Sequence, residues 1–218
     1  MSTTTQTDAR DKPTPRHFSM IRNFQAADLI TLVNGFSGTG AVLSLMKYLI
    51  SHDAAFLWTA FVLFPIALVA DFMDGRVARW RGKSSLMGQE LDSLADVVSF
   101  GVAPAALAFA LGMQGGLDVA ILLYFVGCGI SRLARYNVTA TTLADKPGGK
   151  VKYYEGTPIP TSLLLVGVLA FLAWQGRIGD ALPFGSLEIA GLTLHPLTLL
   201  WFLSGSAMIS KTLHIPKP

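Results

Sequence analysis

The chain has 218 residues, of which 51% are apolar and only 14% are charged, and its mean hydropathy is +0.49. A soluble domain carries about 25% charged residues, so this composition excludes an ordinary soluble domain and also an intrinsically disordered chain. The single cysteine excludes a disulfide framework and a cysteine-based zinc site, and a net charge of +3 is too small to indicate a nucleic-acid partner. The composition predicts an all-α integral membrane protein in contact with membrane lipid.

Six apolar segments are long enough, or nearly so, to cross the hydrocarbon core of a bilayer, which takes roughly 20 helical residues. The sixth segment is the shortest, and Pro65 and Pro104 are expected to kink the second and the third. In chain order, we expect transmembrane helices over 27–50, 54–73, 93–113, 117–138, 159–176 and 195–210.

The residues before the first apolar segment are polar. Residues 1–15 are rich in Thr, Asp and Pro, which predicts a disordered cytoplasmic tail and no cleavable signal peptide. Residues 16–25 are compatible with an amphipathic helix lying in the membrane interface, or with a continuation of the flexible tail. The membrane domain is therefore expected over residues 16–218.

Basic residues are distributed unevenly over the connections between the segments. All Lys and Arg residues except Lys47 and Arg177 fall on the side that holds both termini and the connections over 74–92 and 132–157. By the positive-inside rule, this predicts six spans with the N- and C-termini in the cytoplasm. A five-span alternative would move the basic C-terminal residues to the opposite side. A bacterial inner membrane and the endoplasmic reticulum both fit this topology.

Four aspartates stand at the connection between the second and third segments, and charges in membrane helices are costly and usually functional. Asp71 and Asp74 lie three residues apart, and Asp92 and Asp96 lie four apart, so each pair shares one face of its helix. Because the connection is short, the two helices should be antiparallel neighbours with all four carboxylates together near the cytoplasmic side. The alternative is that these aspartates are interfacial residues paired with the basic residues of the connection.

Four carboxylates at one place would repel one another, and divalent cations would offset that repulsion. Ligands that are all oxygen favour hard ions such as Mg²⁺ or Mn²⁺, which also bind phosphate oxygens. Gly75, Ala78 and Gly88 are small enough to let a ligand approach the helix backbones, and Arg79 is placed to neutralise a phosphate. The pattern predicts a site for a diphosphate ester held by two metal ions, which is an arrangement known for phosphoryl displacement.

These residues resemble the signature of the CDP-alcohol phosphatidyltransferase family. All eight positions are filled, as Asp71-x2-Asp74-Gly75-x2-Ala78-Arg79-x8-Gly88-x3-Asp92-x3-Asp96. The resemblance implies a six-helix fold, a homodimer, and transfer of a phosphatidyl group from CDP-diacylglycerol to an alcohol with release of CMP. It also implies roles for the signature residues. The metal ligands would be Asp71, Asp74 and Asp92, with Asp96 sharing a metal and acting as general base, and the CDP pocket would be lined by Gly75, Ala78, Arg79 and Gly88.

Polar and small residues alternate in the first apolar segment. Asn34 and Ser37 stand beside Gly35 and Gly38, and small residues at such spacing favour close packing of membrane helices. The family resemblance also allows Asn34 to reach the metal or the diphosphate of CDP-diacylglycerol.

Longer blocks, among them NFQAADLITLVNGFSG, GISRLARYNVT and KYYEGTPIPTSL, resemble the phosphatidylserine synthases of this family, especially the fungal ones, and this resemblance implies L-serine as the acceptor. Arg132 and Arg135 could clamp the serine carboxylate, where the fork of arginine is favoured. Tyr136 and Asn137 could add hydrogen bonds, and Glu155 could pair with the ammonium group. Anchoring of the arginines at the membrane or on a lipid phosphate, and a plain turn at Glu155, are the alternatives.

Two other functions are compatible with the sequence. A sister enzyme of the same family would use inositol, inositol phosphate or glycerol-3-phosphate, and Lys150 and Lys152 could serve a phosphorylated acceptor. A cation or proton transporter would also carry acids in its membrane helices. Its acids should be spread through the depth of the membrane, however, whereas these gather at one end beside arginines.

Overall fold

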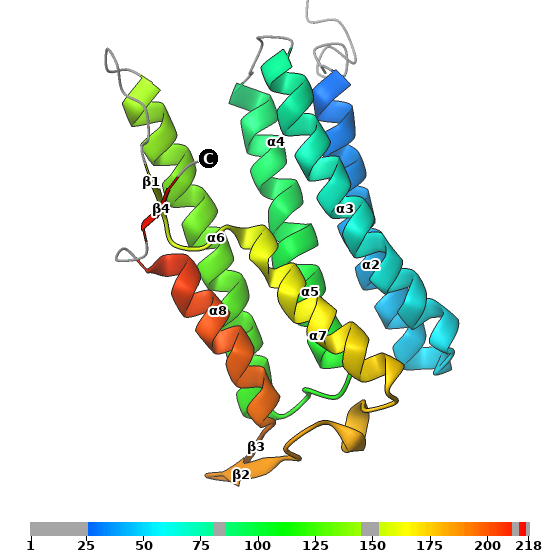
Figure 1. Cartoon of the computed structure of the whole chain (residues 1–218). Coiled ribbons are helices and arrows are strands. Elements are labelled where there is room, and N and C mark those ends of the chain that lie inside the picture. The colour runs from blue at the N-terminus through cyan, green and yellow to red at the C-terminus, as the bar shows by residue number, and fades with distance from the viewer. Residues whose placement is uncertain (1–25, 81–85, 145–152, 211–213, 217–218) are drawn as a thin grey trace, which may run out of the picture.

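The computed structural model of the chain describes residues 26–80, 86–144, 153–210 and 214–216 (Figure 1). It is mostly helical, as the composition predicts, and it adds two short pairs of antiparallel strands. The tail expected over 1–15 and the interfacial segment expected over 16–25 lie outside the described residues.

Within the described residues, four helices are long and apolar enough to cross a membrane, so the chain is a membrane protein. They coincide with the first four expected spans. The helices on either side of the acidic connection extend farther than expected, because no proline interrupts the chain after Pro65 until Pro104. Their bounds are α2 (Ala26–Ser51), α3 (Ala54–Trp80), α4 (Leu86–Asp96) continued by η1 (Val97–Val102) and α5 (Ala103–Ala110), and α6 (Gly116–Ala144).

The last two apolar segments form shorter helices. A 3₁₀ turn, η2 (Ile159–Thr161), leads into α7 (Ser162–Trp174), and a second turn, η4 (Pro196–Thr198), leads into α8 (Leu199–Ile209). At a rise of 1.5 Å per residue, these runs cover roughly 24 and 21 Å, which is less than the roughly 30 Å of a hydrocarbon core. They are therefore shorter than the four helices that precede them.

The helices form an up-and-down bundle (Figure 1). α2 packs along α3, α6 packs against α8, and α5 contacts both α6 and α7. Large side chains from four elements fill the interior, namely Phe64, Phe100, Phe125 and Trp201. The start of α2, the end of α3, the start of α4 and the end of α6 all lie at the upper end in Figure 1.

The strands lie outside the bundle core. β1 (Tyr153–Glu155) pairs antiparallel with β4 (His214–Pro216). β2 (Leu187–Ile189) and β3 (Leu192–Leu194) form a hairpin after the 3₁₀ turn η3 (Gly179–Ala181). Its two turn residues, Ala190 and Gly191, both have positive φ, as a two-residue hairpin turn requires. This hairpin lies at the lower end in Figure 1, away from the α3–α4 connection.

The third span is not a uniform α-helix. The segment η1, which begins directly after Asp96, is a π-helix, and Ser99, Phe100 and Gly101 within it are buried. Pro104 stands in the first turn of α5, so the helix changes its geometry just before this proline. Pro65 lies inside α3, which continues on both sides of it. Short π-helical turns are rare and often occur at functional sites.

Asp118 fixes the lower end of α6. This residue lies in the first turn of α6 and is fully buried. Its carboxylate accepts hydrogen bonds from the backbone N–H of Gly115 (2.9 Å), the backbone N–H of His195 (2.8 Å) and the Thr198 hydroxyl (2.7 Å), and His195 Nδ1 lies 2.6 Å from Oδ2. One buried side chain therefore joins the start of α6 to the turn that opens α8.

Candidate active site

Three carboxylates from two antiparallel helices meet at the upper end of the bundle. Asp71 and Asp74 lie on α3, Asp92 lies on α4, and one oxygen from each lies within 4.8 Å of the others. Asp74 is buried, and Asp71 and Asp92 are partly buried. We call this group the acidic cluster. The three- and four-residue spacings place each pair of carboxylates on one face of its helix, as the sequence predicts.

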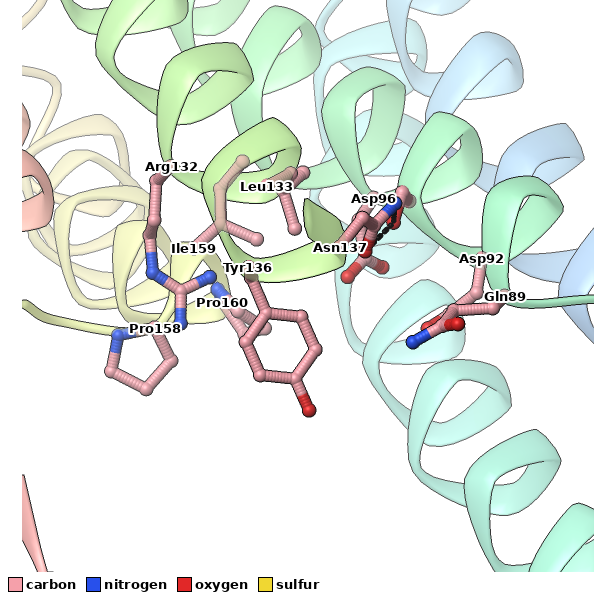
Figure 2. Close-up of a pocket in the computed structure, with 11 residues that line it drawn as sticks. Gln89, Asp92, Asp96, Arg132, Leu133, Tyr136, Asn137, Pro158, Ile159 and Pro160 are labelled. Carbon is pink, nitrogen blue, oxygen red and sulfur yellow. Dashed lines mark hydrogen bonds between the residues drawn. The ribbon is translucent and has the colours of Figure 1, made fainter. Parts of the chain in front are cut away.

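The fourth expected aspartate, Asp96, lies one helical turn beyond Asp92. It is buried, and its Oδ1 accepts a hydrogen bond of 3.0 Å from Asn34 Nδ2. Asp92 and Asp96 line the same cavity (Figure 2). The acidic cluster therefore borders this cavity through Asp92, and Asp96 lies on the same wall.

The acidic cluster fits a hard divalent cation. Its donors are all carboxylate oxygens, and the buried Asp92 Oδ1 has no hydrogen-bond partner among the described residues. Within that same part of the chain, none of the three carboxylates forms an ion pair with Lys or Arg. The guanidinium of Arg76, one of the basic residues that could have paired with them, lies 4.9 Å from the centre of the Phe72 ring instead.

Thr31 is a member of this site that the sequence did not single out. Its hydroxyl donates a hydrogen bond of 2.6 Å to Asp74 Oδ2, across the interface between α2 and α3. It belongs to a row of buried polar residues three positions apart along α2, together with Asp28, Asn34 and Ser37. A polar residue at every third position of an apolar span is a signal that the sequence carries, and it could have identified this face.

A cavity of about 380 Å³ opens between α4, α6 and the turn before α7 (Figure 2). Among the residues expected to bind serine, Arg132, Tyr136 and Asn137 line it, whereas Arg135 does not. The backbone of Glu155 pairs with β4 at His214, and its side chain lies outside the described part of the structure. The complete lining consists of Gln89, Asp92, Ser93, Asp96, Arg132, Leu133, Tyr136, Asn137, Pro158, Ile159 and Pro160.

The side chain of Asn137 is engaged with α4. Its Nδ2 donates to Ser93 Oγ (3.0 Å) and to Glu90 Oε2 (3.4 Å), and its Oδ1 lies 3.3 Å from the same serine oxygen. Asn137 therefore ties the wall of the cavity on α6 to the helix that carries Asp92 and Asp96.

The turn before α7 forms another wall of the cavity and is held firmly in place. Gly156 has φ of +74°, and a Cβ at this position would lie 2.3 Å from the carbonyl oxygen of Met208 on α8. Ile159 is buried against Gly129 of α6, where an added Cβ would lie 2.9 Å from Ile159 Cδ1. The sequence indicated only a turn here. The close approach of this turn to α6 and α8 leaves no pattern in the sequence of the turn itself.

The remaining signature residues lie on the same two helices as the acidic cluster. Gly75 follows Asp74 on α3, and Gly88 lies in the first turn of α4. Ala78 and Arg79 lie in the last turn of α3, and their side chains are outside the described part of the structure. Their expected contacts with CDP-diacylglycerol thus stay predictions.

Comparison with known proteins identifies relatives of this chain. A CDP-diacylglycerol–serine O-phosphatidyltransferase of Saccharomyces cerevisiae is 52% identical over 204 residues, which is 93% of this chain and 74% of the relative. An enzyme of the same name from Bacillus subtilis is 34% identical, covering 66% of this chain and 73% of the relative. An archaetidylserine synthase of Methanothermobacter thermautotrophicus is 34% identical, covering 71% of this chain and 61% of the relative. The family model for CDP-alcohol phosphatidyltransferase matches residues 24–203, and the chain therefore belongs to this family.

Proposed function

We propose that the protein transfers the phosphatidyl group of CDP-diacylglycerol to the hydroxyl of L-serine and releases CMP, which is the reaction of a phosphatidylserine synthase. The observation that carries this proposal is the cavity in which Asp92 and Asp96 of the signature face Arg132 and Tyr136 of α6. A metal-binding acidic side and a basic side then border one space, as a diphosphate donor and a carboxylate-bearing acceptor require. The names of the relatives favour serine among the alcohols.

The donor side of the site consists of the signature residues. Asp71, Asp74 and Asp92, with Asp96 shared, would hold Mg²⁺ or Mn²⁺, and we propose two ions per site. When bound, such ions neutralise the diphosphate and the charge that develops on the CMP leaving group. Gly75, Ala78 and Gly88 would let the nucleotide approach the helix backbones, and Arg79 would neutralise a phosphate.

The acceptor side would lie in the cavity. Asp96 accepts the proton of the serine hydroxyl, and the serine oxygen bonds to the phosphatidyl phosphorus as the bond from that phosphorus to the bridging oxygen of CMP breaks. CMP departs with the bridging oxygen. Arg132 binds the serine carboxylate, where its planar fork can donate two hydrogen bonds, and Tyr136 adds a third polar contact.

Three further residues were expected to bind serine, and they differ in the support that they receive. Arg135 lies on α6 outside the cavity lining, so its contribution would be to the charge near the entrance. Glu155 would pair with the ammonium group of serine if its side chain points toward the cavity wall that precedes α7. Asn137 would contribute by its amide only where Ser93 and Glu90 leave it capacity.

We further propose that α7 and α8 complete a six-span arrangement with both termini in the cytoplasm. The distribution of Lys and Arg supports this topology. The nucleotide would then bind at the cytoplasmic face, and the acyl chains would leave sideways between helices into lipid. An interfacial helix over 16–25, a homodimer, and residence in a bacterial inner membrane or the endoplasmic reticulum rest on the sequence and on the family resemblance.

One experiment tests the reaction and its acceptor. The purified protein is incubated with labelled CDP-diacylglycerol, Mg²⁺ or Mn²⁺, and one alcohol at a time, and CMP release is measured. We expect release with serine and none with inositol, inositol phosphate or glycerol-3-phosphate. Release with another alcohol but not with serine would overturn the choice of acceptor. Ion flux in proteoliposomes without any CMP release would favour the transporter.

A further inference from the structure

Asn34 of α2 is completely buried, and it holds the third span at two points. Its side-chain Nδ2 donates to Asp96 Oδ1 at 3.0 Å, and its backbone carbonyl accepts a hydrogen bond of 2.9 Å from Ser99 Oγ. Asp96 and Ser99 lie on either side of the junction between α4 and the π-helical segment η1. A single residue of α2 therefore clamps both sides of that junction.

The backbones of α2 and of the third span lie very close together beside Asn34, which fixes the two contacts that Asn34 makes. A Cβ on Gly38, one turn after Asn34, would lie 2.4 Å from Ser99 Oγ and 2.6 Å from Ser99 Cα. A Cβ on Gly35 would lie 3.5 Å from the Cβ of Ala95. The small residues noted in the sequence thus allow α2 to lie against the very turn that carries Asp96, and this contact fixes the position of the Asn34 amide.

The junction needs such a clamp because the helix changes its geometry there. A π-helical turn is wider than an α-helical turn, and its hydrogen bonds skip one more residue. Asp96 is the last residue of α4 before this change, so its orientation depends on contacts from outside its own helix. The contacts with Asn34 come from a neighbouring helix, α2, which also packs along α3.

We infer that Asn34 is a positioning residue for the transfer reaction: its amide holds Asp96 Oδ1 so that Oδ2 faces the acceptor hydroxyl. This inference rests on the proposed function, and it differs from the role that the family resemblance allows Asn34, which is contact with the metal or the diphosphate. An amide N–H can only donate, so it keeps Oδ1 as an acceptor and leaves Oδ2 to take the proton. In this role Asn34 acts on the reaction through the hydrogen bond of its amide to Asp96.

The first test compares Asn34→Ala with Ser37→Ala. Ser37 is a matched control because it is a buried polar residue of the same helix. Among the described residues, its hydroxyl bonds only to the Val33 carbonyl of that helix. We expect kcat to fall about 100-fold in Asn34→Ala, the size of effect that a misplaced catalytic group produces, with an unchanged KM for CDP-diacylglycerol. Ser37→Ala should keep both constants. A wild-type kcat in Asn34→Ala would overturn the inference.

The second test separates positioning from binding of the donor. Binding of CMP and of CDP-diacylglycerol is measured by calorimetry in Asp96→Asn and in the double variant Asp96→Asn/Asn34→Ala, and residual CMP release is measured in parallel. If Asn34 acts through Asp96, its removal in this background changes neither binding nor residual release. Weaker binding of CDP-diacylglycerol in the double variant would show that Asn34 contacts the diphosphate, and would overturn the inference.

Ser99→Ala provides a variant that leaves the Asn34 side chain in place. Because it removes only the outer contact of the clamp, we expect a smaller fall in kcat than in Asn34→Ala and again no change in binding of CMP. Unchanged CMP binding also shows that each variant is folded. All comparisons use whichever alcohol the wild-type protein accepts, so a failure with serine bears on the proposed acceptor and not on Asn34. A wild-type kcat in Ser99→Ala together with a full loss of CMP binding in Asn34→Ala would contradict positioning.

Discussion

The hydroxyl of Thr31 donates a hydrogen bond of 2.6 Å to Oδ2 of Asp74. Both residues are buried, so the bond joins α2 to the acidic cluster out of contact with bulk water. A hydrogen bond of this kind fixes the orientation of one carboxylate oxygen and leaves the other free to coordinate a cation. Loss of an outer contact to a metal ligand typically lowers metal affinity by roughly 10- to 100-fold.

Thr31→Val is therefore expected to weaken metal binding while it preserves the shape of the side chain. We expect the Mg²⁺ or Mn²⁺ concentration for half-maximal CMP release to rise about tenfold, the lower end of the range for such contacts. Thr39→Val is the matched control, because Thr39 lies exposed on the same helix and, within the part of the chain that the structure describes, its hydroxyl bonds only to the Gly35 carbonyl. An equal effect of the two substitutions would argue that α2 as a whole, and not the bond to Asp74, was disturbed.

Asp92→Asn should abolish metal binding more completely than Thr31→Val. The substitution replaces one of three carboxylates whose oxygens lie within 4.8 Å of one another, and it introduces an amide N–H that repels a cation. We expect no CMP release. We also expect electron paramagnetic resonance to detect Mn²⁺ binding to the wild-type protein and none to Asp92→Asn. Asp180→Asn, at an exposed aspartate in η3 far from the cluster, should leave both unchanged. Retained Mn²⁺ affinity in Asp92→Asn would place the metal elsewhere.

Arg132→Lys should raise the KM for serine with little effect on the KM for CDP-diacylglycerol. Lysine keeps the positive charge on the cavity wall, but it lacks the planar fork that can bind a carboxylate through two hydrogen bonds. A loss of about 2 kcal/mol for a charged hydrogen bond corresponds to a rise in KM of roughly 30-fold. Arg177→Lys, at the opposite end of the bundle, is the control. A rise in the KM for CDP-diacylglycerol instead would assign Arg132 to the lipid phosphate.

The hydrogen bonds between Ser93 and Asn137 predict coupled effects of substitution. If Asn137 mainly ties α6 to α4, then Ser93→Ala and Asn137→Ala should each lower stability, and the double variant should lose less than the two single losses together. Coupling energies for such pairs in membrane proteins average about 0.6 kcal/mol. Unfolding in mixed micelles measures the three losses. Full additivity of the two losses would show that the contact between Ser93 and Asn137 contributes nothing to stability, which contradicts a tie between α6 and α4.

The acidic cluster could be predicted because it depends only on the spacing of its aspartates along the chain and on the short connection between two helices. Two aspartates three or four residues apart share a helix face whatever else the helix contacts, and a short connection makes the next helix its neighbour. For Thr31 the sequence carries only part of the information, namely its place in the row of polar residues three positions apart along α2. Its bond to Asp74 depends on how α2 is rotated about its axis against α3, which is a property of the packed bundle. The same holds for Asn137, whose choice between Ser93 and a substrate depends on the spacing of α4 and α6.

The bounds of a helix could be predicted from the sequence only where the length of the apolar segment determines where the helix ends. The first four spans followed from apolar segments that are long enough to cross a membrane despite single polar residues within them. α7 and α8 are shorter than their apolar segments because Gly176, which has positive φ, follows the end of one, and because Pro196 opens the turn that leads into the other. The π-helical turn after Asp96 has no local signal, since its residues would equally form an α-helix. It is held by Ser99 and by the close contact at Gly38.

Asp118→Asn should lower stability without changing the chemistry. The fully buried carboxylate accepts hydrogen bonds from two backbone N–H groups and from Thr198, and an amide cannot accept all of them while its own N–H₂ faces those donors. We expect a loss of about 3 kcal/mol in unfolding free energy, the cost of leaving a buried group unsatisfied, and a lower temperature of inactivation. At a temperature where the variant is still folded, KM for both substrates should match the wild type, because Asp118 lies about 21 Å before Arg132 along α6. Asp180→Asn again serves as the exposed control. A variant with wild-type stability but altered kcat would contradict this prediction. It would mean that a change at Asp118 alters the positions of the α6 residues that line the cavity.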